Sequence, residues 1–187
     1  MKYIISFFVL ITIFLANIQN VWADYEYNMK DCFYFSVPDE FQSETKKHDE
    51  AYFSNTDEES DIDIILLDIP KDEKGNLEEM KKIVLGDMSK FIPEYKQIDE
   101  EKISSDLING YLTKATSYGE NEKEMKVETT VCISSDQKHY LIINIIYPKD
   151  KENKYSNLSE NLVKSIKKQS QVKEEIKTDE NAIKGEI

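Results

Sequence analysis

The chain holds two cysteines, Cys32 and Cys132, and their chemistry depends on the compartment in which the protein resides. Each stands on the less apolar face of a segment that alternates like a β-strand, so a sheet could bring them together. In an oxidising compartment we expect a disulfide, which would close a loop of about 100 residues and stabilise the fold by at most roughly 4.7 kcal/mol. The alternative is two buried free thiols on strands that do not meet.

The two histidines, His48 and His139, are the next candidates for chemistry. A zinc site needs three or four converging ligands, and neither histidine has a Cys or another His beside it at ligand spacing. We interpret both as surface residues and expect no metal site and no cofactor.

The densest acidic run, residues 57–63, could hold a calcium ion. It lacks the glycine turn and the terminal bidentate Glu of an EF-hand loop. Asp61 and Asp63 alternate with isoleucines, which is typical of a strand with one face toward water. We therefore favour a solvated loop that leads into a strand, and we keep a calcium- or small-ligand-binding module as an alternative.

Catalytic motifs are absent from the sequence. It contains no G-x-S-x-G elbow, no phosphate-binding glycine loop and no H-E-x-x-H zinc motif. Acidic residues occur throughout the chain, so a pair of working carboxylates cannot be located by spacing. We expect a protein that is not an enzyme, with an exported hydrolase that uses acidic residues as the alternative.

The N-terminus has the pattern of a secretory signal peptide. Lys2 precedes an uncharged apolar stretch from Tyr3 to Ile18, and a polar break then leads to Ala23. The apolar stretch is shorter than the roughly 20 residues that cross a bilayer. We predict a signal peptide over residues 1–23, with cleavage between Ala23 and Asp24 and no transmembrane segment in the mature chain. The protein would then be periplasmic or secreted.

The charge of the chain argues against a nucleic-acid partner. The formal net charge is −13, and loss of the leader with its single lysine would make it −14. Such a chain repels phosphate backbones. Arginine, the usual bidentate ligand for phosphate, is absent.

The remaining sequence predicts one α+β domain over residues 24–168, followed by a charged, disordered tail over residues 169–187. Alternation predicts a strand over residues 24–37, and a polar run follows it. The other predicted strands cover residues 51–54, 61–69, 95–103, 107–118, 124–134 and 138–147. Helical spacing predicts helices over residues 76–92, capped by Asn76, and over residues 150–168. Asn109-Gly110 could be a hairpin turn or a bulge.

The order of these motifs over residues 25–168 resembles the PsbP and DcrB superfamily. The resemblance rests on F-x-F-S-V-P-x-x-F (Phe33 to Phe41), Asn76-Leu77-Glu78-Glu79, Asn109-Gly110, H-Y-L-I-I-N-I-I-Y (His139 to Tyr147) and N-L-V-K-S-I-K (Asn161 to Lys167). It implies an α/β/α sandwich in which helices flank a central, mostly antiparallel sheet. It also implies a mostly non-catalytic class of accessory and partner-binding proteins, many of them exported. The chain lacks a serine-rich, basic transit peptide, so we expect no role in oxygen evolution.

From the leader, the resemblance and the absence of catalytic motifs we expect an exported, non-catalytic accessory protein that binds another protein. Aromatic residues that could anchor such an interface are Tyr25, Tyr27, Tyr34 and Tyr118. The alternative for each tyrosine is a place in the core or on a sheet face.

Overall fold

A computed structural model describes residues 24–30, 33–47, 49–55, 59–119 and 122–168. The expected signal peptide, residues 1–23, and the expected tail, residues 169–187, lie outside the described residues and stay predictions.

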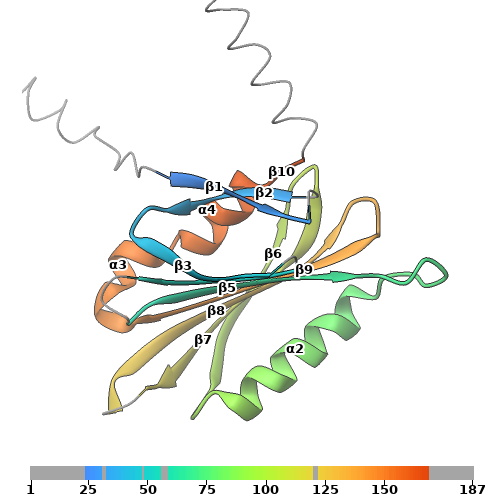
Figure 1. Cartoon of the computed structure of the whole chain (residues 1–187). Helices are drawn as coiled ribbons and strands as arrows, with labels where there is room; N and C mark the ends of the chain where they lie inside the picture. The colour runs from blue at the N-terminus through green and yellow to red at the C-terminus, as the bar shows by residue number, and fades with distance from the viewer. Residues whose placement is uncertain (1–23, 31–32, 48, 56–58, 120–121, 169–187) are drawn as a thin grey trace, which may run out of the picture.

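A seven-stranded antiparallel sheet forms the centre of the domain (Figure 1). Its strand order is β3-β4-β5-β9-β8-β7-β6, so the last four strands form the expected meander. The strands are β3 (Phe41–Lys46), β4 (Glu50–Asn55), β5 (Asp61–Asp68), β6 (Lys96–Ser104), β7 (Ile108–Tyr118), β8 (Glu124–Ser134) and β9 (His139–Pro148). The central, mostly antiparallel sheet of an α+β fold, predicted from the alternating segments, is thereby confirmed.

One face of this sheet is covered by a second, smaller sheet together with helical turns. The small sheet has the order β1-β2-β10, and the chain reaches β10 through three helical segments. These elements are β1 (Asp24–Met29), β2 (Phe33–Pro38), β10 (Lys167–Lys168), η2 (Lys149–Lys151), α3 (Glu152–Tyr155) and α4 (Leu158–Ser165). The expected α/β/α sandwich is therefore corrected on this side, where the covering layer is partly sheet.

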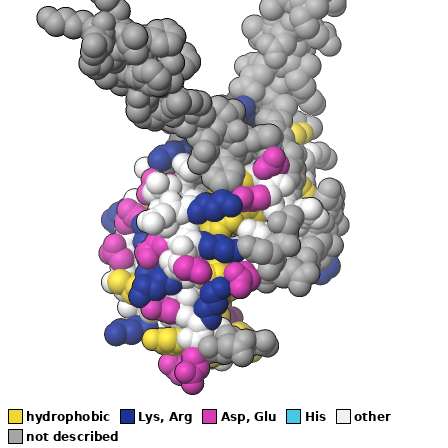
Figure 2. Space-filling model, turned by 90° about the vertical axis from the view of Figure 1, so that its left-hand side faces the viewer, with side chains coloured by type: hydrophobic (Ala, Val, Ile, Leu, Met, Phe, Trp, Pro, Cys, Tyr) yellow, Lys and Arg dark blue, Asp and Glu magenta, His cyan; other side chains and the backbone are white. Residues whose placement is uncertain are grey.

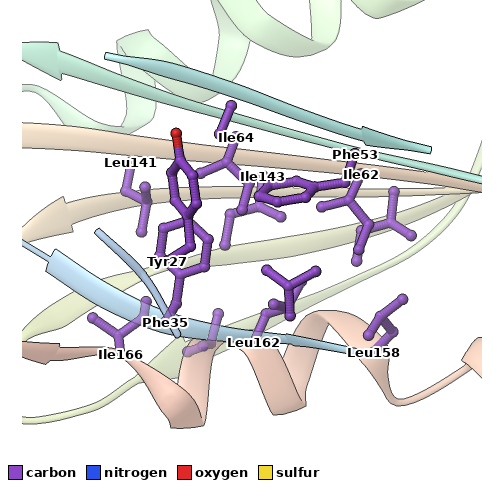
Figure 3. Close-up of a cluster of buried hydrophobic side chains, with 14 of the residues drawn as sticks. Tyr27, Phe35, Phe53, Ile62, Ile64, Leu141, Ile143, Leu158, Leu162 and Ile166 are labelled. Atoms are coloured by element: carbon purple, nitrogen blue, oxygen red, sulfur yellow. The ribbon is translucent and has the colours of Figure 1, made fainter. Parts of the chain in front are cut away.

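The main core lies between these two layers. Phe35 of β2 and Leu158 and Leu162 of α4 lie opposite Ile62 and Ile143 of the large sheet (Figure 3). Each large apolar side chain that is removed from water in this way contributes about 1.5–3 kcal/mol. This layer therefore supplies most of the hydrophobic stabilisation of the domain.

The opposite face of the large sheet is covered by α2 (Leu77–Phe91), which lies against β8 (Figure 1). The predicted cap is confirmed: the Asn76 Oδ1 accepts the Glu79 N–H at 3.2 Å, and the Asn76 Nδ2 donates to the Glu79 Oε2 at 3.1 Å. No residue of α2 is fully buried. The helix is anchored through Leu77 and Met80, which pack against a small cluster of Ile69, Ile133 and Tyr140.

The N-terminal strand predicted over residues 24–37 is two strands. β1 and β2 pair antiparallel, with Tyr27 opposite Phe35. Lys30 lies at the reversal with φ 50, a left-handed conformation that a continuous strand does not adopt. The side-chain alternation is the same in one strand and in two, so the sequence pattern did not show the turn.

The polar run after Pro38 contains a strand that the sequence analysis missed. β3 is the edge strand of the large sheet and pairs with β4 alone. Edge strands commonly carry charged and polar residues, and Phe41 is the one apolar residue of β3, so alternation did not reveal this strand.

Asn109-Gly110 is neither a hairpin turn nor a bulge. Both residues lie inside β7 with regular pairing, and Gly110 is opposite Cys132. A Cβ atom on Gly110 would stand 2.3 Å from the Val131 carbonyl oxygen and 2.6 Å from the Cys132 Sγ. Close approach of the neighbouring strand therefore explains this glycine.

The C-terminal helix predicted over residues 150–168 is interrupted. It consists of η2, α3 and α4, and the chain then enters β10. The predicted apolar stripe is nevertheless buried, as Tyr155, Leu158, Leu162 and Ile166 all lie in the core.

Candidate functional site

A buried carboxyl group lies in the middle of the large sheet. Glu128 belongs to β8, opposite Lys114 of β7, and is 3% exposed. Its Oε1 accepts a hydrogen bond from the Tyr147 hydroxyl at 2.8 Å. Its Oε2 accepts none from the described residues. An unpaired oxygen of this kind is costly to bury and therefore marks a position of interest.

Burial is the main cause of a raised pKa at Glu128, because removal from water disfavours the charged form. The Ser159 hydroxyl, the Tyr147 hydroxyl and the Lys114 ammonium oppose this effect. Ser159 lies in the first turn of α4, near enough to lower the pKa but outside normal hydrogen-bond geometry. The Glu128 side chain thus lies between the large sheet and the first turn of α4.

A cavity of about 220 Å³ adjoins Glu128. Its ionisable and aromatic lining residues are Asp99, Lys114, Lys126, Glu128, Tyr147 and Glu152. Sequence analysis did not single out any of these six residues. In β8, Lys126 and Glu128 flank the apolar Val127, a pattern typical of a strand with one face toward solvent, whereas residues 127–134 are all buried.

The cavity has part of what a hydrolase needs. Glu128 has the raised pKa of a general acid, and two further carboxylates line the same space. The Glu152 Oε1, however, lies 3.2 Å from the Lys126 Nζ, and the Asp99 Oδ1 accepts the Glu100 N–H at 2.8 Å. Both carboxylates are engaged by neighbours, so the arrangement fits a binding site better than a two-carboxylate mechanism.

The surface on this side of the molecule is mixed in charge. Figure 2 shows basic and acidic side chains interspersed over the face that includes α3. Ion pairs such as Lys126–Glu152 account for the mixture. No long-range field of one sign is expected over a surface of this kind.

The acidic run separates into positions with different neighbours. The Glu59 Oε1 pairs with the Lys123 Nζ at 2.9 Å, and its Oε2 lies 3.4 Å from the Lys151 Nζ. Asp63 has a raised pKa, chiefly because it is partly buried. Within the described residues, no three His, Cys, Asp or Glu side chains gather to hold a metal ion. Residues 57 and 58 of the run lie outside the described part.

His139 is partly buried at the start of β9. Its Nδ1 lies 3.0 Å from the Asp68 Oδ1, and the other Asp68 oxygen accepts from the Lys30 Nζ at 2.9 Å. The hydrogen bond from Lys30 is the main cause of the lowered pKa of Asp68, and the contact with His139 adds to it. His48 lies outside the described residues.

Cys132 is buried in the main core, and burial raises the pKa of its thiol to about 12. A thiol of this kind is unreactive while the protein is folded. Cys32 lies outside the described residues, although Phe33, the next residue, packs in the same core cluster as Cys132. The disulfide between Cys32 and Cys132 stays a prediction.

The four tyrosines proposed as anchors occupy different environments. Tyr27 is buried against Phe35 and Phe53, and Tyr34 is half-buried. Tyr25 belongs to β1, and its side chain lies outside the described part. Tyr118, at 43% exposed, is the one of these three described side chains that is open to solvent.

We define the α2-end patch as the exposed residues at the end of α2 and of β7, namely Phe91, Pro93 and Tyr118. Phe91, the last residue of α2, is 80% exposed. The Tyr118 N–H donates to the Pro93 carbonyl oxygen at 3.5 Å, which joins the end of β7 to the segment after the helix. Pro93 and Tyr118 line an open hollow together with Glu94 and Glu122.

The two acids at this hollow have unusual backbones. Glu94 and Glu122 have φ values of 50 and 58, in the left-handed region that non-glycine residues seldom adopt. Conformations of this kind cost free energy and are concentrated at binding and active sites. The patch therefore combines an apolar centre, an acidic border and local strain.

Among the described residues, no helix combines the length and the apolar composition needed to cross a bilayer.

Comparison of the sequence with protein-family models gives no match, and comparison with curated proteins gives none either. The fold, in contrast, is similar to solved structures. The cyanobacterial PsbP, CyanoP, of Synechocystis sp. PCC 6803 is 15% identical with a TM-score of 0.54, over 81% of this chain and 95% of that one.

Two further structures are similar to a comparable degree. The Ran-binding protein Mog1p of Saccharomyces cerevisiae is 13% identical with a TM-score of 0.56, over 78% of this chain and 95% of that one. LpqN of Mycobacterium tuberculosis, a protein involved in cell envelope biogenesis, is 12% identical with a TM-score of 0.53, over 80% of this chain and 86% of that one. The chain therefore has a PsbP-like fold, as its motifs predicted. At these identities the similarity concerns the fold alone.

Proposed function

We propose that this chain is an exported, non-catalytic accessory protein that binds another protein through the α2-end patch. The observation that carries the proposal is the exposure of Phe91, which is 80% accessible although it ends a helix that packs on the sheet through Leu77 and Met80. Exposed aromatic side chains are typical anchors of interaction sites.

The patch indicates what the partner must offer. Phe91 and Tyr118 would fill an apolar depression, and Glu94 and Glu122 would lie at its border. A partner surface with an apolar centre ringed by Lys or Arg meets both requirements. The formal net charge of the mature chain, −13 for the full sequence and one unit more negative without Lys2, would also accelerate encounter with a basic surface at low salt.

Export is supported by the leader, in which Lys2 precedes an uncharged apolar stretch from Tyr3 to Ile18 and a polar break leads to Ala23. Two of the similar folds, a Ran-binding protein and a cell-envelope protein, are consistent with a binding role but do not identify the partner.

The experiment uses the mature chain with a photo-crosslinking amino acid at position 91, irradiated in the exported fraction of its own organism. The crosslinked protein is identified by mass spectrometry, purified and titrated against the unmodified chain by calorimetry. We expect the double variant Phe91→Ala, Tyr118→Ala to weaken binding by about 2 kcal/mol or more, as for residues at the centre of an interface, or roughly 30-fold in Kd.

The matched control is Ile83→Ala, which removes a 52% exposed apolar side chain from the same helix outside the patch. It should bind as the unmodified chain does. If the double variant binds the crosslinked protein as well as the control does, the patch is not the interface and the proposal fails.

A further inference from the structure

The start of α2 is fixed to the large sheet by several contacts. Just before the helix, a Cβ atom on Gly75 would stand 2.2 Å from the Ile133 Cδ1, so the chain passes close to the sheet there. The Asn76 N–H donates to the Tyr140 hydroxyl at 2.5 Å. Leu77 packs against the small cluster that contains Ile133 and Tyr140. A hydrogen bond and apolar contacts therefore hold this end of the helix.

The two ends of α2 rest on different parts of β8. The start of the helix lies at Ile133, close to the end of that strand. The other end lies near the beginning of β8, because the Pro93 carbonyl oxygen accepts from the Tyr118 N–H at 3.5 Å and Tyr118 is paired with Glu124. The helix thus runs along β8 in the opposite direction.

The sheet surface on the helix side consists of small side chains between these two ends. Val127 and Thr129 are on the same face of β8 as Ile133, because alternate residues of a strand point to the same side. Their partners on β7 are Ala115 and Thr113. These four side chains are at most 2% exposed, and each offers the helix only a small apolar area.

The helix itself buries little against this surface. None of its residues is fully buried. Val84 and Met88, which continue the apolar stripe of Leu77, are half-buried, and Phe91 at the end of the stripe is 80% exposed. The free energy of docking scales with the apolar area removed from water, so the second half of α2 is weakly docked.

A polar cluster at the surface joins α2 to β6 and β7. The Lys81 Nζ lies 3.0 Å from the Glu100 Oε1 and 3.1 Å from the Glu78 Oε2. It also lies 3.9 Å from the centre of the Tyr111 ring, and the Tyr111 hydroxyl donates to Glu78. Ion pairs and cation–π contacts at the surface each contribute little, and salt screens the ion pairs.

We propose that α2 is a hinged cover that opens away from β7 and β8 while both sheets and α4 stay folded. The pivot is the start of the helix, which has the firmest contacts. Opening includes loss of helical hydrogen bonds, because a helix of 15 residues is marginal in water without its packing partner. Such local openings cost less free energy than global unfolding.

Opening has a consequence for the α2-end patch. Phe91 belongs to the half of the helix that moves, so a partner that binds it in one state would shift the balance between the closed and the open state. This consequence rests on the proposed function, whereas the opening itself does not.

The test is native-state hydrogen exchange of the isotope-labelled mature chain without any partner, followed by NMR. We expect the amides of residues 85–91 to be less protected than the central amides of β8 and β9 by roughly 100-fold or more. The amides of residues 81–83, next to the pivot, should have intermediate protection.

The variant Lys81→Met removes the polar cluster and should lower the protection of the α2 amides by roughly 10-fold, with no change in β9. Its matched control is Lys82→Met, since Lys82 is the exposed neighbour on the same helix, and this variant should exchange as the unmodified chain does. Salt at about 1 M should act as Lys81→Met does, because it screens the ion pairs of Lys81.

Three outcomes would overturn the inference. The first is α2 amides that exchange as slowly as those of β8 and β9. The second is loss of protection confined to the last helical turn, which is fraying and not opening. The third is a Lys81→Met variant that exchanges like Lys82→Met or that loses protection equally in all strands. Since no partner is present, failure here leaves the proposed function standing, and failure of partner binding leaves the opening of α2 standing.

Discussion

Tyr147 donates its hydroxyl to the Glu128 Oε1 at 2.8 Å across two neighbouring strands of the large sheet, and both residues are almost completely removed from solvent. The Tyr147 ring also packs edge-on against Tyr155 with the ring centroids 5.6 Å apart. The Tyr155 hydroxyl in turn accepts from the Asn55 Nδ2 at 2.8 Å. Two hydrogen bonds and one aromatic contact thus link β8, β9, α3 and β4 inside the core.

The raised pKa of Glu128 gives a stability change with a defined sign. Its ordinary value is 4.5, and the folded value is higher because of burial. The group therefore stabilises the fold below pH 4.5 in its neutral form, and this contribution is lost as the pH rises through the folded pKa. In the unmodified chain, the free energy of unfolding should fall over this range by at most about 1.4 kcal/mol per pH unit because of Glu128. The variant Glu128→Gln should not show this fall.

Urea unfolding of both proteins at a series of pH values measures this effect. The quantity of interest is the difference between the two curves, because acids with lowered pKa values, such as Glu59 and Asp68, act in the opposite direction in both proteins. A difference that stays constant from acid to neutral pH would contradict the prediction.

Tyr147→Phe tests the hydrogen bond without changing the ring packing. The substitution leaves a second Glu128 oxygen unpaired in the core, and we expect a loss of about 1–3 kcal/mol in the free energy of unfolding. Tyr118→Phe, on an exposed residue, should change stability by less than about 0.5 kcal/mol. Equal stability of the two variants would show that the buried hydroxyl contributes nothing.

Two glycines give a matched pair with opposite expected effects. Gly110→Ala would place its Cβ against the Val131 backbone and the Cys132 Sγ, so we expect destabilisation of about 1–3 kcal/mol from overpacking. Gly86 lies inside α2, where an added Cβ atom would meet nothing within 4 Å, so Gly86→Ala should stabilise by about 0.5–1 kcal/mol. Thermal unfolding distinguishes the two, and a stabilising Gly110→Ala would refute the close approach of β7 and β8.

The disulfide prediction is tested by counting thiols. Denatured, unreduced mature protein should show no reactive thiol if Cys32 and Cys132 are bonded, and reduction should lower stability by about 2–4 kcal/mol. The folded protein is uninformative, because Cys132 is buried. Two reactive thiols in the denatured sample would rule the bond out.

The leader prediction is tested by the mass of the exported product. We expect a polypeptide that begins at Asp24, since the small residue Ala23 ends the leader. Substitution Ala23→Leu should block processing and leave a longer, membrane-associated product, whereas Asn20→Gln should be processed normally. An exported product that begins at Met1 would contradict the prediction.

The sequence by itself determined the features that depend on neighbours along the chain. Alternation located β5, β7, β8 and β9 to within about a residue, and the Asn76–Glu79 cap marked the start of α2 where the structure has it. The order of these motifs along the chain was sufficient to predict the fold. These features are local, because strand alternation and helix capping are set by residues two to four positions apart.

Only the tertiary structure decided the features that depend on which strands become neighbours. The turn at Lys30 and the edge strand β3 are not visible in alternation, and Gly110 is explained by Cys132 on the adjacent strand. In the sequence, Glu128 has the pattern of a solvent-facing strand residue, but in the fold it is 3% exposed. Phe91 belongs to the apolar stripe of the predicted helix, but in the fold it is 80% exposed. Burial is a property of the assembled layers, and for this reason both candidate binding sites emerged only when the layers were in place.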